Sequence, residues 1–433
     1  MRRALSLFIF LSIASSVYAQ MDMPGMSAME NTAGFQSSGT SIEPRTTSET
    51  APMIHKTFGD WTLMFHANGF LVNTMQTGLR GKDKTFSANW VMPMLSREFG
   101  RHTVAFRTML SFEPATVTSR RYPLLFQSGE TAYGLPIVDG QHPHDLFMEI
   151  AGRYDFRFGE RARLFVYGGP VGEPALGPTP FPHRASASEN PVAVLGHHQQ
   201  DSTHLSNSVI TLGLVQGPVQ LEASTFHGKE PNENRWNIDK GRPDSFSSRV
   251  TVGLAASISG QFSIGRINNR EALEPDLDTL RTTASVHHSA RFRGGHVASS
   301  LIWGRNKDTH HDERRIFNAY TAESTVNFMD RNWVWTRIEN VDRDRTLLVG
   351  ETPAALGVEE DPIGRVQAYT FGYERDLMVK PSLRIGLGMQ VMTYGLPSQL
   401  KSVYANRPSG VMFFLHIRPG GNIGQHMQMM HQR

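Results

Sequence analysis

The chain has 433 residues, and its 43 Lys and Arg residues nearly balance its 40 Asp and Glu residues, which leaves a formal net charge of +3. Because no dense basic cluster accompanies this balance, nucleic acid is not an expected partner. Cysteine is absent, which excludes a disulfide framework, thiolate metal sites and thiol nucleophiles. The length suits either two or three soluble domains or one large barrel.

The chain begins with a predicted export signal. Arg2 and Arg3 precede a mostly apolar stretch, and Val17-Tyr18-Ala19 offers residues that a signal peptidase reads, so residues 1–19 are a predicted signal peptide. The apolar stretch is shorter than the roughly 18 to 20 residues that a membrane-spanning helix requires, and no later stretch reaches that length. We therefore expect export without a membrane-spanning helix.

The segment that follows, residues 20–56, is rich in Met, Ser, Thr, Gly and Pro and has few large apolar side chains. Because such a segment cannot bury a core, it is predicted to be a flexible periplasmic arm. We expect an ordered domain over residues 57–419 and a tail rich in Met and His over residues 420–433.

Within the ordered domain, segments of about ten residues alternate apolar and polar side chains, as strands with two different faces do. In one segment the apolar positions are Leu383, Ile385, Leu387, Met389 and Val391, and the polar face carries Arg384 and Gln390. Other polar faces carry charge, and the predicted lumen-facing residues include His66, Asn68, Arg107, Glu149, Arg153, Asp155, Glu222, Arg249, Glu323, Arg337 and Glu339. Such charge suits a water-filled lumen, whereas a soluble β-sandwich or propeller, the alternative, would bury a face without charge.

About 16 alternating segments are present, within a range of 14 to 18, and an even number is typical of bacterial barrels. They begin near residues 61, 86, 102, 147, 162, 207, 218, 245, 261, 280, 296, 315, 332, 365, 382 and 410. Between the predicted strands, short turns alternate strictly with long loops such as 112–146 and 171–205. The pattern predicts an all-β transmembrane antiparallel barrel in the outer membrane of a Gram-negative bacterium, with short periplasmic turns and long extracellular loops. Its expected partners are outer-membrane lipid and the barrel-assembly machinery.

Two long loops carry clustered histidines and carboxylates. The first cluster contains His142, His144 and Asp145, and the second contains His197, His198, Asp201 and His204. Imidazole with carboxylate is a ligand set for zinc, copper(II) or nickel. We expect the clusters to meet at the extracellular mouth as a metal-binding vestibule. The alternative is that these side chains satisfy hydrogen bonds within hydrated loops. His310 and His311, among basic residues, are predicted to lie in a solvated loop.

Methionine is concentrated near both ends of the chain, with some histidine. The residues are Met21, Met23, Met26, Met29, His426, Met427, Met429, Met430 and His431. Thioether sulfur is a soft donor that favours copper(I) or silver(I). The tails are therefore candidate metal collectors, unless their methionines are a chance feature of polar tails.

No phosphate-binding loop, nucleophile elbow or catalytic triad signature is present, so catalysis is not expected. Ser202 with His204 is the one weak indication of the alternative, an outer-membrane hydrolase.

The export signal, the arm with Met21, Met23, Met26 and Met29, and the histidine-containing loops resemble the outer-membrane copper resistance protein B group. The chain also resembles uncharacterised proteobacterial and acidobacterial barrels, through residues 140–146, 198–205 and 226–239. It lacks the long Met and His repeats of the copper group. The resemblance implies an outer-membrane channel or binding protein that handles copper or another transition-metal ion, and no other cofactor is expected. The alternative is a general porin for small polar solutes.

Overall fold

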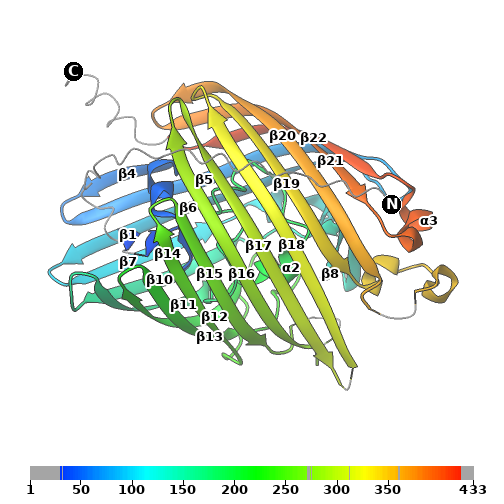
Figure 1. Cartoon of the computed structure of the whole chain (residues 1–433), viewed down its shortest axis with the longest axis horizontal. Coiled ribbons are helices and arrows are strands. Elements are labelled where there is room, and N and C mark those ends of the chain that lie inside the picture. The colour runs from blue at the N-terminus through cyan, green and yellow to red at the C-terminus, as the bar shows by residue number, and fades with distance from the viewer. Residues whose placement is uncertain are drawn as a thin grey trace, which may run out of the picture.

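The computed structural model describes residues 30–420, apart from 32, 271–273, 275, 312, 359 and 360. The chain forms a closed antiparallel β-barrel of 16 strands, as predicted (Figure 1). The barrel strands are β5 (Trp61–Gln76), β6 (Lys84–Phe99), β7 (His102–Leu110), β10 (Phe147–Arg157), β11 (Ala162–Gly172), β12 (Ser206–Gln216), β13 (Val219–His227), β14 (Ser245–Ala255), β15 (Ile258–Ile267), β16 (Asp278–Phe292), β17 (Gly295–His310), β18 (Glu313–Phe328), β19 (Asn332–Arg343), β20 (Gly364–Lys380), β21 (Leu383–Gly395) and β22 (Ser409–Arg418).

The barrel closes where β22 pairs with β5, from Gly410 opposite Gln76 to Ile417 opposite Gly69. A shorter strand, β4 (Met53–Phe58), pairs with the first part of β5, from Trp61 to His66. Because β6 occupies the other edge of β5 along nearly its whole length, β4 and β22 share one edge. The first and last strands therefore start and finish at the same rim, which is the rim of the short turns.

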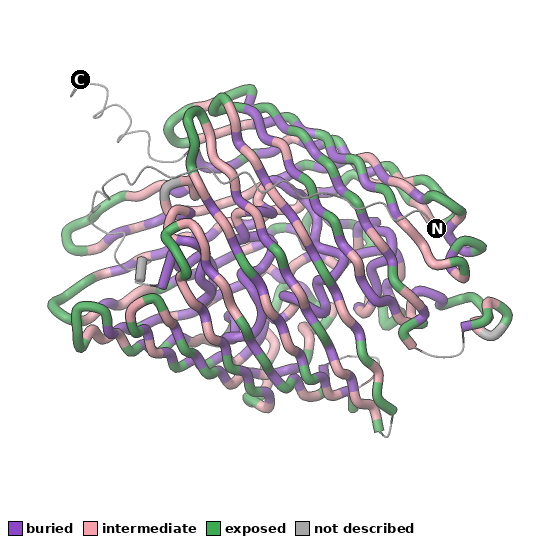
Figure 2. Tube along the Cα trace, in the orientation of Figure 1, coloured by how far each residue is buried: buried purple, intermediate pink, exposed green. Residues whose placement is uncertain are grey.

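Burial alternates along the strands, as Figure 2 shows. On β21 the outward Leu387 is 55% exposed, whereas the inward Gln390 is fully buried. The outward positions of the other strands carry Leu, Ile, Val, Phe and Tyr, which suit the hydrocarbon layer of a membrane. The predicted assignment of faces on this strand is confirmed. No helix among the described residues is long and apolar enough to span a membrane.

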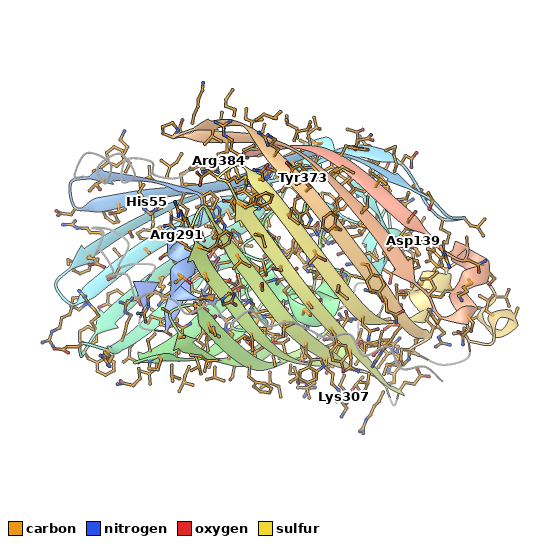
Figure 3. All side chains as sticks on the ribbon, turned by 45° about the horizontal axis from the view of Figure 1, so that its top comes forward. His55, Asp139, Arg291, Lys307, Tyr373 and Arg384 are labelled. Carbon is orange, nitrogen blue, oxygen red and sulfur yellow. The ribbon has the colours of Figure 1, made fainter. Side chains whose placement is uncertain are left out.

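The connection between β17 and β18 differs from the strict alternation of short turns and long loops that the sequence predicted. His310 ends β17 and Glu313 begins β18, so these two strands form a long hairpin with a tight tip. Lys307 lies near this tip (Figure 3). The expected solvated loop around His310 and His311 is therefore a strand end and a turn.

The N-terminal segment, defined here as residues 33–47, lies inside the barrel and not in a flexible arm. Its residues include the short strands β2 (Gly34–Gln36) and β3 (Ile42–Glu43), and most of them are buried. The side chains of Gln220 and Arg249 donate to the main-chain and side-chain oxygens of Thr40, at 2.8 and 2.9 Å. The expectation of a flexible arm is wrong for this part, because polar main chain can be satisfied by a polar lumen as well as by water.

Two long loops also fold into the lumen. The β7–β10 loop (residues 111–146) contains α1 (Glu113–Thr116), β8 (Tyr122–Ala132) and β9 (Leu135–Gln141). The β11–β12 loop (residues 173–205) contains α2 (His197–Gln200), which lies against the inner side of β17 and β18 (Figure 1). Nearly every residue of the β11–β12 loop up to Asp201 is buried.

Apolar contacts hold the β7–β10 loop against part of the inner wall. The ring of Tyr122 stacks on Phe86 of β6 at 4.3 Å between centroids, and Phe126 packs against Tyr394 of β21 at 4.8 Å. The inward face of this part of the barrel is therefore apolar, because loops and not water cover it. The further described elements are β1 (Glu30–Asn31), η1 (Arg45–Glu49), η2 (Thr118–Arg120), η3 (Ser202–His204), η4 (Arg345–Leu348), η5 (Pro353–Leu356), η6 (Ser398–Leu400) and α3 (Lys401–Tyr404).

Candidate metal centre

The β11–β12 loop is held by side chains of the wall that donate to its main-chain oxygens. Arg249 donates to Gly177 at 3.1 Å, and Arg337 donates to Val192 at 3.1 Å. The remaining contacts of this kind join Arg281 and Asn306 to the oxygen of His198 and Arg343 to the oxygen of Leu195. Guanidinium groups thus satisfy loop carbonyls that would otherwise be buried without partners.

One side chain of the loop, that of Arg184, in turn donates to a carboxylate of the wall. Arg184 is fully buried, and its guanidinium pairs with Asp201 of the same loop at 3.1 Å and with Glu323 of β18 at 2.5 Å. Glu323 is shared with Arg337, at 2.8 Å. Removing one member of such a buried network leaves an unpaired charge, so the network fixes the position of the loop in the lumen.

Three histidines of the predicted clusters meet inside the barrel, and we call His144, His197 and His204 the imidazole cluster. The ring centroids of His144 and His204 are 5.6 Å apart, and those of His197 and His204 are 5.2 Å apart. Phe181 packs edge-on against His197 and His204. The structure brings histidines of the two loops together, but they meet in the barrel interior and not at the extracellular mouth that we expected from the sequence.

Each ring of the imidazole cluster is anchored through Nδ1. This atom lies 3.0 Å from a Glu113 carboxylate oxygen in His144, 2.7 Å from Asp201 Oδ1 in His197 and 2.9 Å from the Asp201 main-chain oxygen in His204. Because these oxygens accept, Nδ1 carries the hydrogen and the lone pair of a neutral ring is left on Nε2. The Nε2 atom of His204 is buried without a partner among the described residues.

Burial and neighbouring charges set the protonation of the cluster. Burial, reinforced by the charges of His197 and His144, lowers the pKa of His204 to about 3. Burial also lowers the pKa of His197, against the opposing effect of Asp201. At His144 the lowering effect of burial is outweighed by the Glu113 carboxylate, so its pKa is raised. Two of the three rings are therefore neutral near neutral pH, which is the form that binds metal.

The remaining residues of the two predicted clusters form ion pairs. Glu130 accepts from His142 Nε2 at 2.9 Å and lies 3.5 Å from His198 Nε2. Burial lowers the pKa of His198, but the carboxylates of Glu130 and Glu230, each 3.5 Å from a ring nitrogen, raise it to about 10, so this ring is an imidazolium. Asp145 pairs with Arg235 at 2.9 Å. These groups neutralise one another beside the imidazole cluster.

A group that sequence reasoning missed lies where the β11–β12 loop meets the inner wall. Glu189, Glu374 and His416 are the one trio of imidazole and carboxylate ligand atoms within 4.8 Å of one another in the described part of the chain. Arg418 donates to both carboxylates, at 3.2 and 2.5 Å. Because this guanidinium already supplies the positive charge, the trio is an ion-pair cluster and not an open cation site.

Several predicted site residues lie outside the described residues. These are Met21, Met23, Met26, Met29, His426, Met427, Met429, Met430 and His431, together with the predicted signal peptide. Glu113, Glu130 and His183 were missed as neighbours of the imidazole cluster, because an isolated residue in a long loop carries no periodic signal of what it will face. Ser202 Oγ accepts from Arg281 at 3.0 Å, and the Nε2 atom of His204 has no hydrogen-bond partner among the described residues, so no hydrogen bond joins the two as nucleophile and base.

Solved structures share this fold at low sequence identity. OmpF of Salmonella typhi, solved in complex with daunomycin, matches with a TM-score of 0.51 and 8% identity over 84% of this chain and 100% of its own. OprB of Pseudomonas putida matches with a TM-score of 0.50 and 8% identity over 87% of this chain and 96% of its own. No protein-family model and no curated protein sequence matches the chain. The chain therefore has the fold of an outer-membrane β-barrel.

Proposed function

We propose that this outer-membrane barrel handles a transition-metal ion, copper first, by binding it at the imidazole cluster in its lumen, without catalysis. The observation that carries the proposal is that His144, His197 and His204 lie together and are all anchored through Nδ1. Each ring is fixed through Nδ1 by an oxygen of the protein, and Nε2 is left to bind. Metal-ligating histidines in proteins are fixed in this way by second-shell oxygens.

The spacing of the rings supports the same proposal. With metal–nitrogen distances of about 2 Å and tetrahedral angles, the centroids of two ligating imidazoles lie about 5 Å apart. The contacts that His204 makes with His197 and His144 are 5.2 and 5.6 Å. Rotation of the rings is still required to direct all three Nε2 atoms at one ion. Imidazole donors suit copper(II), zinc and nickel.

The surroundings fit transient binding and passage better than permanent storage. The β7–β10 and β11–β12 loops that carry the cluster fill the lumen, so an ion that crosses the barrel meets these loops. The carboxylates of Glu130 and Glu230 lie next to the cluster, each 3.5 Å from a ring nitrogen of His198. Two carboxylates contact the imidazole cluster itself, those of Glu113 and Asp201, and Asp201 is already paired with Arg184.

The proposal is tested by titrating the full mature chain, folded in detergent, with copper(II) and with zinc(II). His204→Gln should abolish most of the binding, because it removes the central ring. Glu113→Gln should weaken binding by about 10- to 100-fold, as loss of a second-shell partner does. The matched control is His310→Gln at the tip of the β17–β18 hairpin, which should bind as the wild type does.

Equal affinity in the wild type and in His204→Gln would contradict the proposal. Absence of binding in every form, together with a conductance that copper does not change, would favour the alternative, a porin for small polar solutes.

A further inference from the structure

A group of methionines gathers inside the barrel, in contact with Phe35 of the N-terminal segment. We call it the methionine cluster, and its members, each at most 4% exposed, are Met53, Met64, Met92, Met94, Met109 and Met148. They come from the adjacent strands β4, β5, β6, β7 and β10. The only other buried members of this apolar group are Phe35 and Trp90.

The composition of this group is unusual for ordinary packing. Methionine accounts for 20 of 433 residues, yet it supplies six of the eight buried members here. Methionine fills irregular gaps in cores, but a core built for packing alone is mostly Leu, Ile and Val. The cluster thus presents several soft, uncharged sulfur donors in one place.

A buried histidine contacts one of these sulfurs through one ring nitrogen, and its other ring nitrogen has no partner among the described residues. His183 of the β11–β12 loop places Nε2 3.2 Å from Met109 Sδ, and its Nδ1 is buried without a partner in the described part of the chain. Its ring centroid lies 4.5 Å from Trp90 and 5.9 Å from His66. A buried ring nitrogen without a partner is costly, so its position requires another explanation than stability.

His183 also lies close to the imidazole cluster along the chain. Phe181, two residues earlier in the β11–β12 loop, packs against His197 and His204. Burial above all, with the guanidinium of Arg107 acting in the same direction, holds the pKa of His183 well below the usual range, so this ring is a neutral donor.

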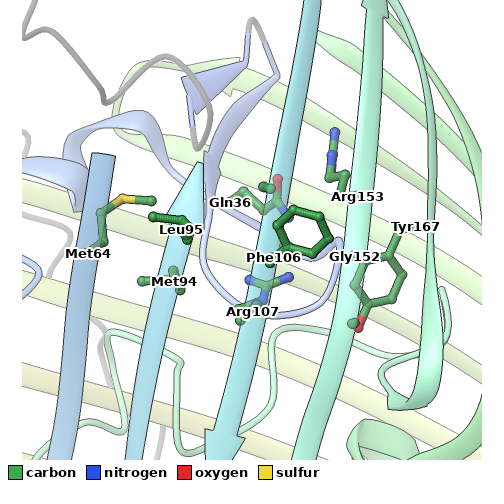
Figure 4. A pocket seen from close by; sticks show the side chains of 11 residues that line it. Gln36, Met64, Met94, Leu95, Phe106, Arg107, Gly152, Arg153 and Tyr167 are labelled. Atoms are coloured by element: carbon green, nitrogen blue, oxygen red, sulfur yellow. The ribbon is translucent and has the colours of Figure 1, made fainter. Parts of the chain in front are cut away.

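Two cavities adjoin this arrangement. One is lined by Trp90, Phe181 and His144, beside the imidazole cluster. The other is lined by Met64 and Met94 together with Gln36 of the N-terminal segment and the side chains of Arg107 and Arg153 (Figure 4). A cavity therefore adjoins each cluster.

We propose that His183, Met109 and the neighbouring sulfurs of the methionine cluster form a second site, for a soft monovalent cation such as copper(I) or silver(I). Thioether sulfur and neutral imidazole prefer soft ions. Because none of these donors is charged, a single positive charge costs less to bury here than a double charge would. The proposal does not rest on the imidazole cluster, which offers harder nitrogen donors to divalent ions.

Silver(I), which has no redox chemistry under these conditions, is the probe for a test on the full mature chain. Methionine methyl groups labelled with ¹³C report each residue separately by NMR, and Met→Leu variants assign their signals. Addition of silver(I) should shift the Met109 signal and those of its neighbours, while the lipid-facing Met389 of β21 should not move. Met109→Leu should weaken silver(I) binding at these signals by about tenfold or more. Met389→Leu is the matched control.

Unchanged signals of the methionine cluster in the presence of silver(I) would overturn the proposal, as would equal silver(I) affinity at these signals in Met109→Leu. The proposals for the two sites can be contradicted independently of each other. His204→Gln should lose zinc(II) binding and keep the silver(I) shifts of the methionine cluster, whereas Met109→Leu should keep zinc(II) binding.

Discussion

Replacement of Arg184 by methionine should release the β11–β12 loop from the barrel wall. Arg184 is fully buried and pairs with both Asp201 and Glu323, so its loss leaves two buried carboxylates with fewer partners. Breaking a buried ion pair by removing one partner costs about 3 to 5 kcal/mol. At about 1.4 kcal/mol per factor of ten, this shifts the equilibrium between seated and released loop by about 150- to 4000-fold.

The absence of cysteine from the chain provides a direct assay. Ala193 of the β11–β12 loop is only 4% exposed, so Ala193→Cys should react slowly with a water-soluble maleimide while the loop is seated. In the background of Arg184→Met the labelling rate should rise in proportion to the released population, and single-channel conductance in planar bilayers should rise with it.

Arg153→Met is the matched control, because Arg153 pairs at 2.8 Å with Asp155 on its own strand, β10. This variant should label at the wild-type rate. Both variants are compared only as folded barrels, identified by the heat-dependent shift on gels. Equal labelling of Ala193→Cys with and without Arg184 in folded barrels would refute the assignment of this network as the anchor of the loop.

Three further outcomes are expected. The folded protein keeps His204 neutral down to about pH 3, whereas His144 has a raised pKa, so metal binding at the imidazole cluster should displace about one proton. The affinity measured by calorimetric titration should therefore rise about tenfold per pH unit between pH 5 and 6.5. A rise near a thousandfold over this interval would contradict the assignment. Burial raises the pKa of both Glu43 and Glu173 to about 7, above the unfolded value of 4.5, so the stability that these groups give to the buried N-terminal segment is complete at low pH and is lost as pH rises through 7. Protease cleavage of residues 33–47 should therefore increase from pH 6 to pH 8. A decrease would contradict this direction of the pH dependence. Leu387 lies near the middle of the outward face of β21, so Leu387→Arg should destabilise the barrel by about 2 to 4 kcal/mol in urea titrations in lipid. Leu79→Arg in the β5–β6 loop should leave the stability unchanged. Equal stability of the two variants would argue against the lipid-facing assignment of Leu387.

The barrel was predictable from the sequence because lipid outside and polar groups inside impose a period of two on every strand. The predicted strand starts lie within three residues of the observed ones, from Trp61 in β5 to Ser409 in β22. The tight hairpin at His310 and His311 was missed, because polar and charged residues occupy both the ends of long strands and the loops beyond them.

The contents of the lumen were not predictable in the same way. A segment that folds against a polar wall has the composition of a disordered arm, so residues 33–47 gave no sign of burial. The histidine-rich loops gave a correct indication that His144 and His204 meet. The methionine cluster did leave a signal, since Trp90, Met92 and Met94 occupy alternate positions of one strand and make its inward face apolar. Only the position of the β11–β12 loop brings His183 to that face.

Apart from Arg184, the wall holds the β11–β12 loop chiefly by its carbonyl oxygens, at positions such as Gly177, Val192 and Leu195. A carbonyl oxygen is the same in every residue, so these contacts do not depend on which side chains the loop carries. Sequence change at loop positions that make no ion pair with the wall can therefore alter what the lumen presents without altering these contacts. A barrel built on this plan can diversify its ligand by substitution within one segment, while its wall stays constant.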